Sequence, residues 1–242
     1  MLSRKLLEVG WKARERRTLF WFGLSFVLLQ VSRGLFWIYG NRSDSDQAEA
    51  LNHLGIWWRL LGKRLSFPAL LYRSVSLHQK ALQLNPRSVA TLRNLASAFL
   101  DLGDLGTAQG YVSLALDALS KDANAERGDL LMHKAEIAIC NGDLDIAWEL
   151  VKDSLDCLFS GKDRVPEKVW YIWYTKSLLL IARIKKPQGE LNFARTSAML
   201  AFKMAREHDL PFRRHQAKQL VRLLVEGSDS SDVKISEREC AA

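Results

Sequence analysis

From about residue 90 onward, large apolar residues recur three and four positions apart, which is the spacing of amphipathic helices. Small residues lie among them at Ala96, Ala108 and Ala115, and a polar turn surrounds Gly103. Small side chains let two helix backbones approach closely, while large side chains fill the gaps between the helical turns. The pattern therefore predicts two antiparallel helices joined at Gly103.

The same pattern returns further along the chain, so the sequence contains internal repeats. Gly142 and Ala147 follow Gly103 and Ala108 by 39 residues. This interval predicts another helix pair of the same kind, preceded by a linker with about five extra residues near 120–126.

An earlier copy ends near Ala81, which precedes Ala115 by 34 residues. Its expected turn lies at Gly62, and this copy holds seven more residues than the next one. We place the extra residues around 63–71, where Pro68 interrupts the helical pattern.

A fourth, more divergent pair is expected over residues 169–184 and 191–208, with its turn at residues 187–189. Alanines at helical spacing supply the small-residue face of the second helix. A final helix from Pro211 to about residue 226 would cap the last repeat. The four alanines are Ala194, Ala198, Ala201 and Ala205.

These helix pairs resemble the tetratricopeptide repeat (TPR), a helix–turn–helix unit of 34 residues. The resemblance covers about residues 50–208. It implies an all-α fold over residues 50–226, a right-handed superhelical solenoid of antiparallel helix pairs with a C-terminal capping helix. It also implies binding of proteins or peptides in the concave groove rather than catalysis. From face position alone, the candidate groove residues are Arg93, Asn94, Ser97, Lys134 and Glu136.

Residues 19–40 form a mainly apolar segment whose 22 residues, as a helix rising about 1.5 Å per residue, would cross the hydrocarbon core of a bilayer. Aromatic residues gather at both ends, where interfacial belts form. Arg33 is the one charge, and it lies close enough to the second end to reach the interface. The sequence thus predicts a transmembrane helix, in which the interfacial and charged residues are Trp21, Phe22, Arg33, Trp37 and Tyr39.

A cleaved signal peptide and a core or interfacial helix are the alternatives for this segment. A signal peptide is disfavoured because residues 38–40 make a poor cleavage site, and an interfacial helix because residues 19–32 carry no charge. The basic segment 1–18 holds six Lys and Arg residues. The positive-inside rule therefore places the N-terminus in the cytoplasm and the repeats on the opposite side of the membrane.

The net charge of +8 is distributed in blocks. Residues 51–100 contain seven basic residues and no acidic one, residues 101–163 contain thirteen acidic and five basic residues, and residues 164–226 are basic again. Nucleic-acid binding normally requires one continuous basic face, so no nucleic-acid partner is expected. The polar tail, residues 227–242, is expected to be disordered.

Catalytic chemistry has no recognisable motif in this sequence. There is no GxGxxG, phosphate-binding loop, HExxH or GxSxG pattern, and the five histidines are scattered. We therefore expect no enzyme activity, no cofactor and no metal. Cys140 and Cys157 would lie about 15–20 Å apart along the helix axis of their repeat, which predicts two free thiols.

Two aromatic groups fit either burial or partner binding. Trp57 and Trp58 stand beside Arg59, Lys63 and Arg64, and are either core of the first repeat or an element that rests on the membrane or on another subunit. The cluster at residues 170–174 is expected to be buried at helical spacing, with a partner-binding patch as the alternative.

The leading functional hypothesis is a membrane-anchored scaffold that recruits or assembles partner proteins. The alternative is a permanent structural subunit of a membrane complex, packed through its transmembrane helix and Trp-rich first repeat. A regulatory nucleic-acid binder is a third, weaker hypothesis. The acidic block at 101–163 favours a partner segment with basic groups.

Overall fold

The computed structural model describes residues 43–226. Within this range the chain is all-α, with nine α-helices and one short 3-10 helix, η1 (Lys162–Arg164). It divides between Ala118 and Leu119 into two compact units, which we call the N-terminal unit and the C-terminal unit. The helices are α3 (Asp44–Leu65), α4 (Pro68–Leu84), α5 (Val89–Asp101), α6 (Leu105–Ala118), α7 (Asn124–Asn141), α8 (Leu144–Ser160), α9 (Glu167–Lys185), α10 (Leu191–Glu207) and α11 (Pro211–Glu226).

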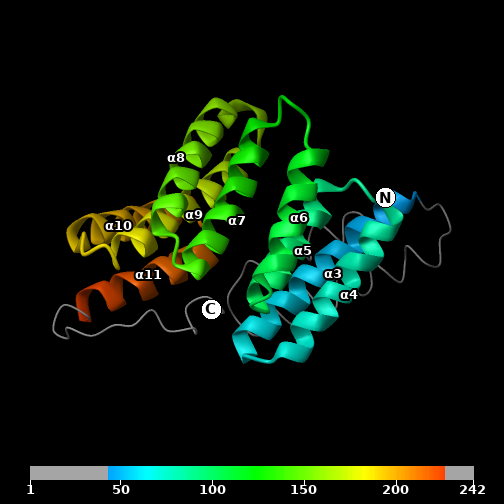
Figure 1. Ribbon diagram of the computed structural model, residues 1–242, viewed down its shortest axis with the longest axis horizontal. Helices are drawn as coiled ribbons and strands as arrows, with labels where there is room; N and C mark the ends of the chain where they lie inside the picture. Colours follow the sequence, from blue (N-terminus) through cyan, green and yellow to red (C-terminus); the bar gives the residue numbers. More distant parts are fainter. Residues whose placement is uncertain (1–42, 227–242) are drawn as a thin grey trace. The chain divides into compact units, whose positions relative to one another are not determined.

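The N-terminal unit consists of the pairs α3–α4 and α5–α6, with α4 also packed against α5 (Figure 1). Serine hydroxyls cap two of these helices, since Ser43 and Ser88 accept hydrogen bonds from backbone N–H groups in the first turns of α3 and α5. Gly103 makes the turn between α5 and α6 with a φ of +78°, a conformation that favours glycine. The predicted helix pair around Gly103 is confirmed.

The predicted interruption within residues 63–71 is confirmed, but the turn expected at Gly62 is misplaced. α3 continues past Gly62 to Leu65, Ser66 ends it in a left-handed conformation, and α4 begins at Pro68. Proline suits the first position of a helix because no intrahelical partner is needed for its missing N–H. The extra residues thus lengthen the two helices. Gly62 lies inside α3, where an added Cβ would stand 2.9 Å from a Leu71 methyl carbon.

The C-terminal unit contains the pairs α7–α8 and α9–α10, and α11 packs against α10 and α9 (Figure 1). Gly142 and Gly189 make the two turns, with φ values of +85° and +80°. The predicted small-residue faces and the final helix are confirmed. The alanines of the α10 face are completely or almost completely buried, and they are Ala194, Ala198, Ala201 and Ala205.

The aromatic cluster at residues 170–174 contributes to this core. Trp170 and Trp173 are buried, and the indole N–H of Trp170 donates to the backbone carbonyl oxygen of Leu158 at 2.9 Å. Tyr171 and Tyr174 are half-buried and pack against the Trp170 ring. Burial therefore accounts for the two tryptophans.

The predicted membrane segment 19–40 and the tail 227–242 lie outside the described residues, as do Trp21, Phe22, Arg33, Trp37 and Tyr39. None of the helices between residues 43 and 226 combines the length and the hydropathy that a bilayer crossing requires.

Candidate partner-binding surfaces

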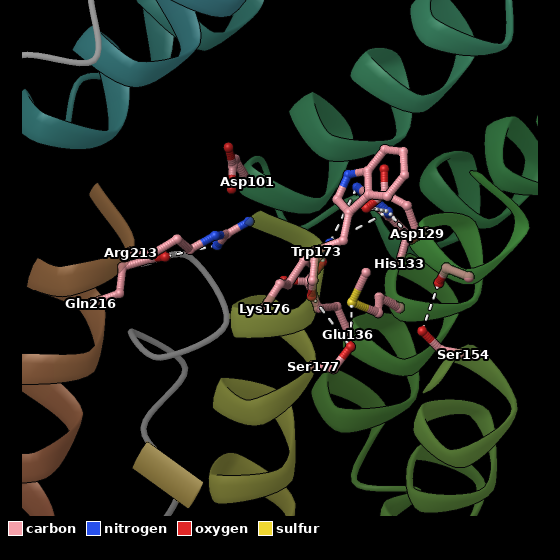
Figure 2. Close-up of polar contacts among 12 residues, drawn as sticks. Asp101, Asp129, His133, Glu136, Ser154, Trp173, Lys176, Ser177, Arg213 and Gln216 are labelled. Atoms are coloured by element: carbon pink, nitrogen blue, oxygen red, sulfur yellow. Dashed lines mark hydrogen bonds and ion pairs between the residues drawn. The ribbon is translucent and has the colours of Figure 1, made fainter. Parts of the chain in front are cut away.

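A cluster of charged side chains lies between α7 and α9, the first helices of two consecutive pairs (Figure 2). Asp129, His133 and Glu136 follow one another at intervals of four and three residues, so all three lie on one face of α7. Lys176 reaches this face from α9, and its Nζ lies 2.8 Å from Oε2 of Glu136. We call these four residues the α7–α9 cluster.

His133 is held inside the α7–α9 cluster in its neutral form. Burial and the neighbouring Lys176 ammonium lower the pKa of His133 to about 4. The neutral ring donates its Nδ1–H to the backbone carbonyl oxygen of Asp129, at 2.8 Å. The Nζ of Lys176 lies 3.4 and 3.5 Å from the two ring nitrogens.

Glu136 forms the solvent-facing edge of the cluster. Burial opposes ionisation of its carboxyl group, but the ammonium of Lys176 outweighs this and holds the pKa of Glu136 well below its usual range. The Glu136 side chain is 26% exposed, against 8% for that of Lys176. The cluster thus offers a carboxylate edge to solvent while its ammonium is covered.

A second polar layer joins three helices of the N-terminal unit. Asn52 from α3 accepts a hydrogen bond from Nδ1 of His78 in α4, at 2.8 Å, and its amide nitrogen donates to Oγ1 of Thr91 in α5. All three side chains are buried. Burial, together with the positive charges of Arg59 and His53, lowers the pKa of His78 to about 3. This layer is closed to solvent, so it holds the unit together and offers no contact surface.

The predicted groove residues fall at different depths. Asn94 and Ser97 are buried on α5, Arg93 beside them is half-buried, and Lys134 and Glu136 are half-buried on α7. Arg93 and Asn94 belong to the N-terminal unit and the α7 residues to the C-terminal unit. The structure therefore provides two separate candidate faces, one on each unit.

The tryptophans of the first repeat are part of its packing. Trp57 is buried and meets Trp58 edge to face, with ring centroids 4.9 Å apart. The guanidinium of Arg73 lies 4.5 Å above the Trp58 ring. Trp58 is half-buried, so only part of it is open to contact from outside.

The basic residues beside these tryptophans are partly neutralised. Asp101 at the end of α5 binds Lys63 at 2.8 Å and Arg59 at 3.3 Å, which ties α5 to α3. Asp101 is nearly covered, so this pairing is structural. Arg64 remains exposed at the end of α3.

A metal-binding arrangement is not found among residues 43–226. No group of three or more His, Cys, Asp and Glu side chains in this range is placed to hold a metal ion. Cys140 and Cys157 are half-buried thiols outside any disulfide, as the sequence predicts, and burial raises the pKa of the Cys157 thiol.

No protein-family model and no curated protein matches this chain. Solved structures do resemble it. BtubC from P. vanneervenii has a TM-score of 0.52 at 13% identity, over 89% of this chain and 78% of that chain. Pseudomonas aeruginosa PilF has a TM-score of 0.48 at 16% identity, over 90% and 96% of the two chains. The APC/C hetero-tetramer Cut9–Hcn1 has a TM-score of 0.36 at 13% identity, over 99% of this chain and 52% of that one.

The likeness to BtubC, with the consecutive antiparallel pairs, shows that the described residues have a TPR-like helical-repeat fold. At 13% identity it establishes the fold alone. The shared architecture says how the chain is built and leaves its partners open.

Sequence reasoning missed the α7–α9 cluster apart from Glu136. The spacing of Asp129, His133 and Glu136 could have placed three polar residues on one helix face. Their partner Lys176 stands 40 residues after Glu136, and no local pattern connects the two. The His78 network was missed for the same reason.

Proposed function

We propose that this protein is an interaction scaffold, anchored in a membrane by residues 19–40, that binds segments of partner proteins on its TPR-like repeats. The fold supports this, because consecutive helix pairs place their first helices side by side and so create an extended surface. In the C-terminal unit these first helices are α7 and α9, which are in contact.

The observation that carries the proposal is the α7–α9 cluster. Burying charged groups is costly compared with burying apolar groups of similar size, so a charged cluster between two helices is poorly explained by stability alone. Glu136 is the partly exposed member of this cluster, and its side chain is 26% exposed. Its carboxylate favours a partner segment that carries basic residues.

The test is quantitative co-purification with the full-length chain. Glu136→Gln removes a charge from α7, and we expect the partner proteins to be recovered at a several-fold lower level. Lys152→Gln on α8 is the control, since Lys152 is exposed and lies outside the α7–α9 cluster, where it pairs with Glu149 and stands 5.9 Å from the Trp148 ring. If Glu136→Gln and the control recover identical partners in identical amounts, the α7 face is not the binding surface.

The anchor is tested separately. We expect the full-length chain to stay with membranes after alkaline carbonate extraction, and a chain lacking residues 19–40 to be released. Protease added to sealed vesicles checks the proposed orientation, in which the repeats lie on the side opposite the cytoplasm. Release of the full-length chain by carbonate would refute the anchor.

A structural subunit is the second candidate function, and the turn between α3 and α4 favours it. Leu65, Phe67 and Tyr72 are all more than half exposed at or near this turn. Exposed apolar groups gathered in one place are typical of contact sites. Replacing residues 19–40 by an unrelated transmembrane helix distinguishes the two functions: a scaffold that uses only its repeats keeps its partners, whereas a subunit that packs through its own helix loses them.

A further inference from the structure

A groove of about 710 Å³ runs between α10 and α11, and none of its lining residues belongs to the α7–α9 cluster. Its walls come from one face of each helix. On α10 the lining residues span residues 196–203, two helical turns or about 10 Å, and on α11 they span residues 218–222. The residues that line the groove are Thr196, Met199, Leu200, Phe202, Lys203, Lys218, Val221 and Arg222.

The floor of the groove is apolar and open to solvent. Met199 is 55% exposed and Leu200 37% exposed, although both lie inside a well-formed helix. Below them α11 is fixed to α10, because Leu224 is buried against Ala194 and Ala198 and the Arg195 guanidinium donates to the carbonyl oxygen of Leu224 at 3.1 Å. The groove is thus a preformed surface, since its walls are held by contacts beneath it.

The rim of the groove is cationic. Lys203, Lys218 and Arg222 are its only charged lining residues, and all three are exposed. The two helices together carry seven basic residues and only two acidic ones, Glu207 and Glu226. A ligand that fills the groove therefore meets apolar groups in its centre and positive charge at its edges.

We propose that this groove binds an amphipathic helix of a partner protein, with acidic residues flanking its apolar stripe. Two packed helices present ridges and grooves that accept a third helix, and apolar grooves of this kind are a common mode of helix recognition. The cationic rim favours acidic residues on both sides of the apolar stripe of the bound helix. Methionine in the floor adapts to side chains of different shape.

This site is independent of the proposed function. The groove lies on α10, the second helix of its pair, and on the capping helix α11. The proposed scaffold surface lies on α7 and α9, the first helices of their pairs. Failure of one leaves the other unaffected, because the variants that test them are on different helices.

The experiment uses the full chain in nanodiscs of phosphatidylcholine, which has no net charge. The probes are two fluorescein-labelled helical peptides of 16 residues with the same leucine stripe, one flanked by glutamates and one by lysines. We expect fluorescence anisotropy to show at least about tenfold tighter binding of the glutamate peptide. The difference should shrink as salt is added, because ions screen the rim charges.

Two variants and a control locate the binding. Met199→Glu should weaken binding of the glutamate peptide about tenfold or more, since the substitution replaces an apolar contact by a charge of the same sign as the peptide's flanks. Lys218→Glu combined with Arg222→Glu should reverse the preference toward the lysine peptide. Ile146→Glu on α8 is the control, because Ile146 is equally exposed, at 58%, and lies outside the groove. Met199 and the rim residues are exposed, so circular dichroism should show intact folding.

Several results would overturn the proposal. Equal binding of both peptides, or equal losses in Met199→Glu and Ile146→Glu, would mean that the groove does not select an acidic helix. Much tighter peptide binding by a chain ending at Glu226 would mean that residues 227–242 occupy the groove. If the chain forms dimers that Met199→Glu abolishes, the groove would be assigned to contact with a second copy of this chain. Binding to phosphatidylserine vesicles but to neither peptide would assign it to lipid.

Discussion

Replacing Gly55 by alanine tests how tightly α3 and α4 are fitted together. A Cβ on Gly55 would lie 2.5–2.8 Å from three atoms of the buried His78 ring, closer than real Cβ atoms approach. The ring is buried and its Nδ1 donates to Asn52 at 2.8 Å, so a shift of the ring would disturb this hydrogen bond. The backbone of Gly55 is helical, so strain of the backbone plays no part in the comparison.

The magnitude follows from three contributions. Alanine gains about 1 kcal/mol over glycine inside a helix. Forcing a methyl group into a packed site costs about 1–3 kcal/mol. Loss of the hydrogen bond between Asn52 and His78 costs a further ~1–3 kcal/mol, because both groups are buried. Gly55→Ala should therefore destabilise the protein by about 1–5 kcal/mol.

Gly110→Ala is the matched control, since Gly110 lies inside α6 of the same unit and nothing stands within 4 Å of its added Cβ. It should stabilise the unit by up to about 1 kcal/mol. Thermal unfolding followed by circular dichroism reports both changes, as 1 kcal/mol corresponds to about 4–8 °C in a domain of 60–100 residues.

A double-mutant cycle isolates the cause. If the ring of His78 is the obstacle, Gly55→Ala made in a His78→Ala background should lose its penalty and become neutral or stabilising. A Gly55→Ala variant as stable as Gly110→Ala would refute the reasoning, and so would a penalty that persists without the ring.

Three further predictions concern pH, the α7–α9 cluster and a turn. The pKa values of His78 and His133 are lowered from 6.5 to about 3 and about 4, so the unfolded chain binds more protons than the folded chain below pH 6.5. Stability should therefore be full above about pH 6.5 and fall below it by up to about 1.4 kcal/mol per pH unit for each histidine. Urea titrations from pH 7 to 4 should show a shallower fall in His133→Gln than in the unmodified chain. Lys176→Met leaves the partly exposed Glu136 without the ammonium that pairs with it, and should lower the free energy of unfolding in urea by about 1–3 kcal/mol. Adding Glu136→Gln should restore part of this loss. No recovery would mean that packing of the Lys176 stem dominates. Gly142→Ala forces a side chain into a left-handed turn at φ +85° and should lower stability by about 1–2 kcal/mol, whereas an unchanged melting temperature would show that the turn can rearrange.

The sequence predicted the helix pairs because their signals are local. Gly103, Gly142 and Gly189 mark turns that need positive φ, and the alanines of α10 mark a face that must lie close to another helix. The first pair was misread because Gly62, a residue type typical of turns, is used there for close packing inside α3.

The candidate surfaces were predicted less well, because they depend on residues far apart in sequence. Lys176 and Glu136 are brought together by the fold, although the whole of α8 separates their helices in the sequence. The groove between α10 and α11 was missed because its apolar residues, such as Met199 and Leu200, fit the pattern of an ordinary buried helix face. Periodicity shows which residues share a face and leaves open whether another element covers that face.

The pairing of each helix with its neighbours in sequence has a consequence for how the protein is made. In both units the principal contacts join consecutive helices, so most of the apolar face of each helix is buried against the helices directly before and after it. Such local contacts close short loops and allow fast folding. Translation proceeds from the N-terminus, so α3 to α6 can complete their packing while α7 to α11 are still being synthesised. The same chain order would leave the α10–α11 groove as the last surface to form, available to a partner only once the whole repeat region has been translated.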